Sequence, residues 1–131
     1  MGVKLVALMT ALAAVEVLIF GMLVGRARGT YGIEAPAMGG HPAFERINRV
    51  HQNSIEQLVV FVPLLWAFAA SVSWMGAWIL GAVFIVARIV YAVGYSRDAA
   101  KRGPGAIMTF VVMWILALGS VIGYVIQIAR S

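Results

Sequence analysis

The chain has 131 residues, of which 63% are hydrophobic and only 11% are charged, and its formal net charge is +5. A soluble domain carries about a quarter charged residues, so the composition argues against a water-soluble globule, and lipid is the expected solvent. The absence of cysteine excludes a disulfide framework and a thiol nucleophile supplied by the protein itself.

Four stretches are apolar over roughly 20 residues, the length that a membrane-crossing helix needs. We expect the spans at residues 4–24, 44–72, 74–95 and 105–128. The first could also be a signal peptide, but its cleavage signal is weak and it is long enough to span, so a retained helix is expected. The pattern predicts an all-α integral membrane protein, a four-transmembrane-helix bundle forming a single domain over residues 1–131.

The basic residues gather at one set of span ends. Seven of them lie there, namely Arg26, Arg28, Arg46, Arg49, Arg97, Lys101 and Arg102, against Lys4 and Arg130 at the other ends. The positive-inside rule then places both basic connecting loops in the cytoplasm and both termini outside, with the inner or cell membrane expected if the source is bacterial. The basic face suits anionic lipid or an anionic ligand, and nothing in the pattern indicates nucleic acid.

A polar stripe opens the second span, in FERINRVHQNSIEQ (residues 44–57). On a helix Arg49, Asn53 and Glu56 share one face. A solvated helix extension would explain Glu45 and Arg46. It explains Glu56 poorly, because that carboxylate lies about 15 Å further along the axis than Arg46, at a depth where an unpaired charge is costly. We therefore favour a polar wall of a ligand site.

The two histidines carry less information. His51 lies beside the polar stripe and is predicted to be a wall residue that also contacts the ligand. His41 stands in a loop rich in glycine and proline and is expected to be solvated. Neither has carboxylates at a ligand spacing, so no metal site is predicted.

The third span carries a second polar face. Arg88, Tyr91 and Tyr95 are spaced to share one side of a helix, and Arg102 follows in the next basic loop. Arg88 is costly to expose to lipid, so this face is expected to point into the bundle, where the Tyr91 hydroxyl needs a partner. Guanidinium and phenol donors without excess acid suit a ligand with one or more carboxylates.

Glu16 lies in the middle of the first span. Its distance from the basic end is similar to that of Glu56 and Arg88, which predicts a buried polar layer in which Arg88 is held between Glu16 and Glu56. We expect Glu16 to neutralise a neighbouring charge and stabilise packing rather than to take part in catalysis.

Two of these segments resemble the motifs of the MAPEG family, membrane-associated proteins in eicosanoid and glutathione metabolism. FERINRVHQNSIEQ followed by FVPLLW is similar to the first motif, and RIVYAVGYSRDAAKR is similar to the second, in the same order and on the expected spans. The resemblance implies a homotrimer that binds glutathione as co-substrate between neighbouring subunits. One subunit would contribute Arg49, Asn53 and Glu56, with His51 as a further contact, and its neighbour Tyr91, Tyr95 and Arg102.

The chemistry that the resemblance implies begins with the glutathione thiolate, since the thiolate is the nucleophile. Transferases of the family stabilise it with an arginine at the end of the first helix, and here both Arg26 and Arg28 are candidates. The thiolate would attack a lipophilic electrophile or reduce a lipid hydroperoxide, so transferase and peroxidase activities both remain open. The chain departs from the motif at Gln57, where the family has an aromatic residue, and at Val50, where it has alanine.

Two other functions would account for parts of the sequence. A non-catalytic, lipid-binding scaffold of the same family is disfavoured by Arg49, which that branch lacks. A small multidrug-type transporter would use a membrane glutamate such as Glu16 to exchange protons for cationic drugs. Its arginine-rich inner faces would repel such cations, and the long first loop also argues against it.

Overall fold

A computed structural model describes all of residues 1–131, and its regular secondary structure is entirely helical. In chain order the elements are α1 (Gly2–Tyr31), α2 (Pro42–Ser71), α3 (Trp74–Arg97), the short 3-10 helix η1 (Ala99–Arg102) and α4 (Gly103–Arg130). Four helices are long and apolar enough to cross a membrane, so the predicted all-α four-helix architecture is confirmed. α1 runs well past its expected end at residue 24, because GRARGTY contains no proline and its glycines are tolerated within the helix.

Local sequence signals explain where the helices begin and end. α1 stops at Gly32, which takes the left-handed conformation (φ 66°) that glycine adopts without strain. α2 begins at Pro42, a favoured first helical residue, and the Nδ1 atom of His41 accepts a hydrogen bond from the Ala43 amide. Ser73 caps α3 by accepting from the Gly76 amide. Thus His41, expected to be solvated, has a capping role.

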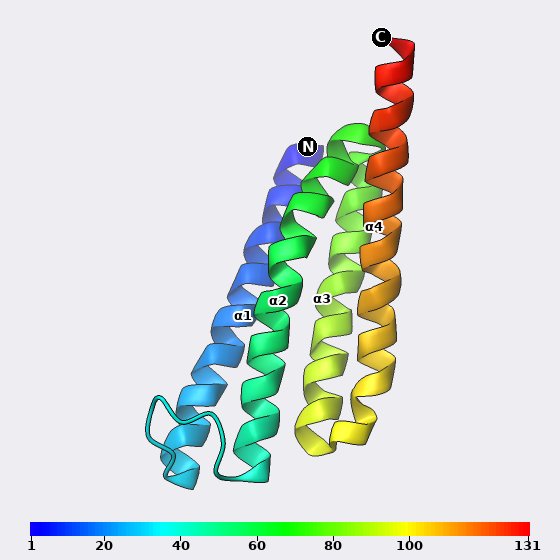
Figure 1. Cartoon of the computed structure of the whole chain (residues 1–131). Helices are drawn as coiled ribbons and strands as arrows, with labels where there is room; N and C mark the ends of the chain where they lie inside the picture. The colour runs from blue at the N-terminus through cyan, green and yellow to red at the C-terminus, as the bar shows by residue number, and fades with distance from the viewer.

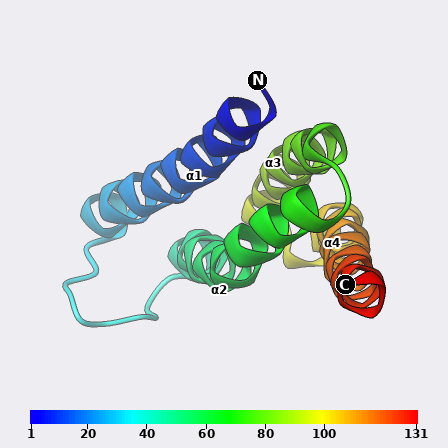
Figure 2. The same cartoon turned by 90° about the horizontal axis from the view of Figure 1, so that it is seen from above.

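The two basic connections lie at the same end of the molecule. Figure 1 shows the α1–α2 loop and the α3–α4 turn together at the lower end, with the two chain termini and the α2–α3 turn at the upper end. We call these the loop end and the terminal end. α2 and α3 form the centre of the bundle, because both pack against α1 and against α4, which lie on opposite sides of them when the bundle is seen from above (Figure 2).

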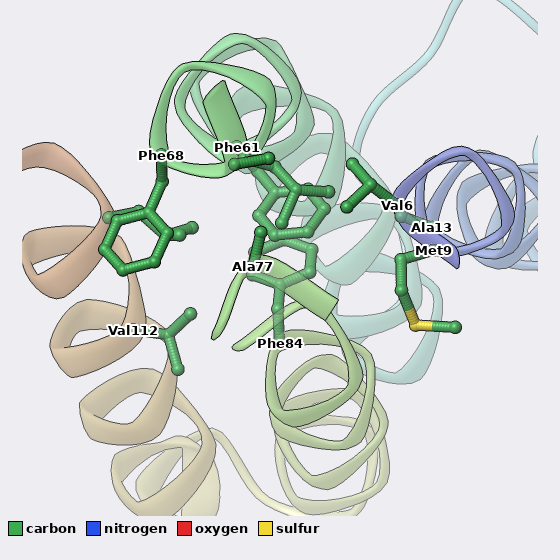
Figure 3. Close-up of a cluster of buried hydrophobic side chains, with 11 residues drawn as sticks. Val6, Met9, Ala13, Phe61, Phe68, Ala77, Phe84 and Val112 are labelled. Atoms are coloured by element: carbon green, nitrogen blue, oxygen red, sulfur yellow. The ribbon is translucent and has the colours of Figure 1, made fainter. Parts of the chain in front are cut away.

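The terminal half of the bundle is filled by apolar side chains. Its core is built on the stacked rings of Phe61 and Phe84, whose centroids are 3.7 Å apart. Figure 3 shows Val6 of α1 directed toward this pair, and Met9 belongs to the same cluster. Large apolar side chains also cover the outside, as at Leu18 and Ile128. Such an exterior would be a liability in water and is ordinary in lipid.

Candidate functional site

A cavity of about 740 Å³ lies between α2 and α4 and has α3 as its third wall. Its lining includes Arg49, Asn53, Gln57, Val60 and Leu64 from α2, Arg88, Tyr91 and Tyr95 from α3, Arg102 from η1, and Ala106, Thr109, Phe110, Met113, Trp114 and Ala117 from α4. This volume is typical of a site for a small molecule.

The cavity changes character along its length. On α2, lining residues recur about once per helical turn, and they run from Arg49 and Asn53 at the loop end to Val60 and Leu64 further toward the middle of the bundle. On α4, the wall deepest from the loop end is apolar, as at Trp114. One end can therefore bind a charged, polar molecule while the other can accept an apolar one.

Arg88 organises the polar end from behind. Its side chain is only 2% exposed, and one guanidinium nitrogen donates to Asn53 Oδ1 at 2.7 Å and to Ser54 Oγ at 2.9 Å. The guanidinium also lies over the Tyr91 ring, 4.2 Å from its centroid, and the Tyr91 and Tyr95 rings stack at 5.6 Å. A single buried arginine thus holds groups of α2 and α3 together.

The predicted partners of Arg88 are partly wrong. Arg88 bonds to Asn53 and Ser54, whereas Glu56 forms an ion pair with Arg49 at 3.3 Å. The Glu56 side chain is 57% exposed and lies on the outside of the bundle, because uncharged acceptors on α2 reach Arg88 first. Glu16 is buried, at 8% exposure, but makes no ion pair.

The structure brings most of the predicted glutathione contacts together within one chain. Arg49 and Asn53 line the same cavity as Tyr91, Tyr95 and Arg102, although the resemblance had placed these two groups on neighbouring subunits. The hydroxyls of Tyr91 and Tyr95 make no hydrogen bond within the chain, and neither does the Arg102 guanidinium. These groups are therefore free to donate to a ligand.

His51 and Glu56 lie outside this cavity. Glu56 faces outward beside Arg49. His51 is half-buried and its ring packs toward α1, where a Cβ on Gly21 would meet His51 Nε2 at 3.2 Å. Neither side chain lines the cavity of its own chain.

The two arginines near the end of α1 have different surroundings. Arg28 donates to the Ala37 carbonyl at 2.7 Å and lies 4.9 Å from the Phe44 ring centroid, so it ties the α1–α2 loop to the bundle. Arg26 is exposed, has no side-chain partner, and lines a smaller groove of about 330 Å³ that also contains Thr30. Neither arginine lines the larger cavity of its own chain.

Some site residues had no usable signal in the sequence. Ser54 is a buried acceptor for Arg88. This role could not be predicted from a single serine next to Asn53 in the sequence. The α4 wall also gave no signal, because Thr109 and Trp114 stand in a helix whose only charged residue is the distant Arg130. Its cavity-facing side can be recognised only in the packed structure. Gln57, the departure from the motif, also lines the cavity, and no cluster of side chains is suited to hold a metal ion.

Comparison with known proteins gives a consistent result. Residues 6–122 match the model of the MAPEG family. The chain is 43% identical to an uncharacterized protein of Synechocystis, covering 95% of this chain and 90% of the relative. It is 36% identical to microsomal glutathione S-transferase 2 of Bos taurus and 30% identical to leukotriene C4 synthase of the same species, in each case over 92% of this chain and 81% of the relative.

The match spans nearly the whole of the helical bundle, including both polar segments and the cavity between α2, α3 and α4. The helices have the length and composition of membrane spans, which agrees with an integral, multi-pass membrane protein. The chain belongs to the MAPEG family.

Proposed function

We propose that this chain is a membrane-bound glutathione transferase that also has the chemistry for glutathione peroxidase activity. The observation that carries the proposal is the cavity itself, which joins a cationic, hydrogen-bonding end to an apolar end within one chain. Relatives named as a glutathione S-transferase and a leukotriene C4 synthase support it. Such a cavity suits a reaction between a polar thiol and a lipophilic partner.

The polar end fits glutathione by charge and by hydrogen bonding. The tripeptide has two carboxylates and an ammonium group. Arg49 and Arg102 offer guanidinium groups to the carboxylates, and the Tyr91 and Tyr95 hydroxyls offer further donors. Glu56, which forms an ion pair with Arg49, would attract the ammonium, with His51 as a more remote contact.

The reaction needs only a stabilised thiolate. The thiol proton leaves to water, and the thiolate sulfur forms a bond with an electrophilic carbon while the leaving group departs. In the peroxidase reaction, the thiolate attacks the hydroperoxide oxygen and expels the alcohol, and a second glutathione then gives the oxidised disulfide and water. The lipophile would occupy the apolar end, near Val60 and Trp114.

Of the two arginines on α1, Arg26 is the better candidate to stabilise the thiolate. Arg28 is held by Ala37 and Phe44, whereas Arg26 is exposed and unpaired. Because Arg26 does not reach the cavity of its own chain, this role needs a neighbouring subunit, which agrees with a homotrimer whose basic loops face the cytoplasm. Arg102 is the competing candidate, since it lines the cavity and has no partner.

The decisive measurement is calorimetric titration of glutathione into the purified, detergent-solubilised protein, followed by turnover with an activated aryl halide and with a fatty-acid hydroperoxide. We expect saturable binding, and turnover in at least the first assay. Binding without turnover would favour a non-catalytic scaffold, and no binding at millimolar glutathione would overturn the proposal. S-methylglutathione should bind but not react, because its sulfur cannot become a thiolate.

The arginines are separated by comparing R26A, R28A, R102A and R97A. Arg97 is the matched control for Arg102, because it lies at the same basic turn but does not line the cavity. If Arg26 stabilises the thiolate, R26A should lower kcat about a hundredfold, whereas R102A should mainly raise the KM for glutathione, by about tenfold. A larger loss of kcat in R102A than in R26A would indicate that Arg102 stabilises the thiolate.

The assembly has its own test. If Arg26 of one subunit serves the cavity of the next, trimers reassembled from a mixture of R26A and R49A chains should regain activity, because some sites would then contain neither substitution. A site built within a single chain predicts that the mixture stays as inactive as its components.

A further inference from the structure

Glu16 and Arg88 are a matched pair of buried charges. Glu16 is 8% exposed and Arg88 is 2% exposed, while every other acidic residue of the chain is exposed and no other basic residue is buried. A buried charge is tolerated when an opposite charge accompanies it. The interior therefore holds one acid and one base, and each is the only available counter-charge for the other.

The packing of α1 against α3 places the two at the same level. These helices run in the same direction (Figure 1), and Gly81 of α3 packs directly on Met9 of α1, since a Cβ added at Gly81 would lie 3.0 Å from the Met9 side chain. Advancing both helices by about two turns from this contact leads to Glu16 and Arg88. One turn further, Phe20 of α1 and Tyr91 of α3 belong to the same buried hydrophobic cluster, together with Val50, so α1 and α3 stay close on both sides of the pair.

Each member also has an atom without a partner. Glu16 Oε2 and Arg88 Nε are buried and make no hydrogen bond. The other side of the Arg88 guanidinium is engaged by Asn53 and Ser54. Arg88 therefore meets α2 and the cavity with one edge and leaves Nε for the interior, where Glu16 supplies the negative charge.

The bond to Asn53 decides which way that amide points. A guanidinium can only donate, so Asn53 must turn its oxygen toward Arg88. Its NH2 group is then the part left for the cavity, which Asn53 lines. Arg88 likewise fixes the Tyr91 ring from behind. The hydrogen-bond donors that Asn53 and Tyr91 present to an anionic ligand therefore depend on the position of the Arg88 guanidinium.

We propose that Glu16 is a positioning residue of the glutathione site, holding Arg88 in the cavity wall against α2 so that Asn53 and Tyr91 present their donors to the ligand. Glu16 itself does not line the cavity, so it acts through Arg88. Without this carboxylate, the only nearby anions for Arg88 are the ligand's own, and the guanidinium would leave Asn53 and Ser54 for them. The inference rests on the proposed function, because it assigns a role at the same site.

The test uses the full-length protein in detergent, with glutathione affinity measured by calorimetry for wild type, E16Q, E16D and T10V. E16Q removes the charge at nearly constant shape, and E16D keeps it. T10V is the matched control, because Thr10 is also a polar residue of α1 with an interhelical bond, from Trp66 Nε1 at 3.0 Å, but it lies away from the cavity. We expect E16Q to weaken glutathione binding about tenfold, while E16D and T10V stay within about threefold of wild type.

Two further readouts separate positioning from general damage. In turnover, E16Q should raise the KM for glutathione and leave the KM for the electrophile unchanged. In a double-mutant cycle, E16Q should weaken binding less on an N53A background than on wild type, because part of its influence passes through Asn53. Unchanged or tighter binding by E16Q, or an equal loss in T10V, would overturn the inference. Failure of wild type to bind glutathione would instead overturn the proposed function.

Discussion

The two halves of the bundle are built from the same helices but held by different forces. In the terminal half, α2 and α3 meet through the stacked rings of Phe61 and Phe84. In the loop half, the same helices meet through Arg88, Asn53 and Ser54, and a cavity opens toward α4. Packing and dispersion hold the first half, whereas buried hydrogen bonds and a charge hold the second.

This difference indicates which substitutions should change the stability of the protein without changing its affinity for glutathione. The change from one kind of contact to the other takes about one helical turn on α3, from Phe84 to Arg88. A substitution in the apolar half should lower stability and leave glutathione binding unchanged. A substitution in the polar half should change binding, and only its buried members should also change stability.

The largest effect is expected for Arg88→Met, which breaks the polar half at its centre. It removes both bonds to α2 and leaves Glu16 as an uncompensated buried charge. We expect a loss of about 3–5 kcal/mol in the free energy of unfolding together with loss of glutathione binding, measured by unfolding in mixed micelles and by calorimetry. Arg130→Met, at the exposed end of α4, is the control. Equal stability of the two variants would refute the role given to Arg88.

The apolar half is broken by Phe61→Ala, which removes one ring of the stacked pair. Phe61 is fully buried, so the expected cost is about 3 kcal/mol of stability. Glutathione affinity at a temperature where the variant stays folded should equal that of wild type. An affinity loss comparable to the one in Arg88→Met would show that the two halves are coupled, and would refute the claim that glutathione binding depends on the polar half alone.

Gly105→Ala tests the contact between α3 and α4 beside the cavity. A Cβ at Gly105 would collide with the Tyr91 backbone, whereas nothing lies within 4 Å of a Cβ at Gly103. We expect Gly105→Ala to push α4 off α3 at a cost of about 1–3 kcal/mol and to weaken glutathione binding, while Gly103→Ala leaves both quantities unchanged. Thermal unfolding and calorimetry on this pair measure the effect, and identical behaviour of the two would argue against close packing at Tyr91.

The smallest stability effect is expected for Glu56→Gln. Its ion pair with Arg49 is solvent-exposed, with side-chain exposures of 57% and 46%, and exposed pairs contribute less than about 1 kcal/mol. The free energy of unfolding should therefore change little. If Glu56 attracts the glutathione ammonium, binding should nevertheless weaken, and a variant unchanged in both quantities would remove Glu56 from the site.

The sequence by itself determined the lipid-facing character, the number of helices and the two polar faces. Long apolar runs need no partner to be recognised, and Arg49 with Asn53 or Tyr91 with Tyr95 repeat at the helical period. The ends of α2, α3 and α4 could also be predicted approximately. The end of α1 could not, because hydropathy marks where a helix leaves the membrane but not where it ends in water.

Only the tertiary structure decided which partners those faces found. Spacing placed Arg88, Glu16 and Glu56 at similar depths, but depth does not fix the angle at which helices face one another. Packing turned Glu56 outward to Arg49 and gave Arg88 to Asn53 and Ser54. It also supplied the α4 wall of the cavity, which carries no charge to mark it. Pairing across helices depends on their register and rotation, and those arise from the summed packing of the whole bundle.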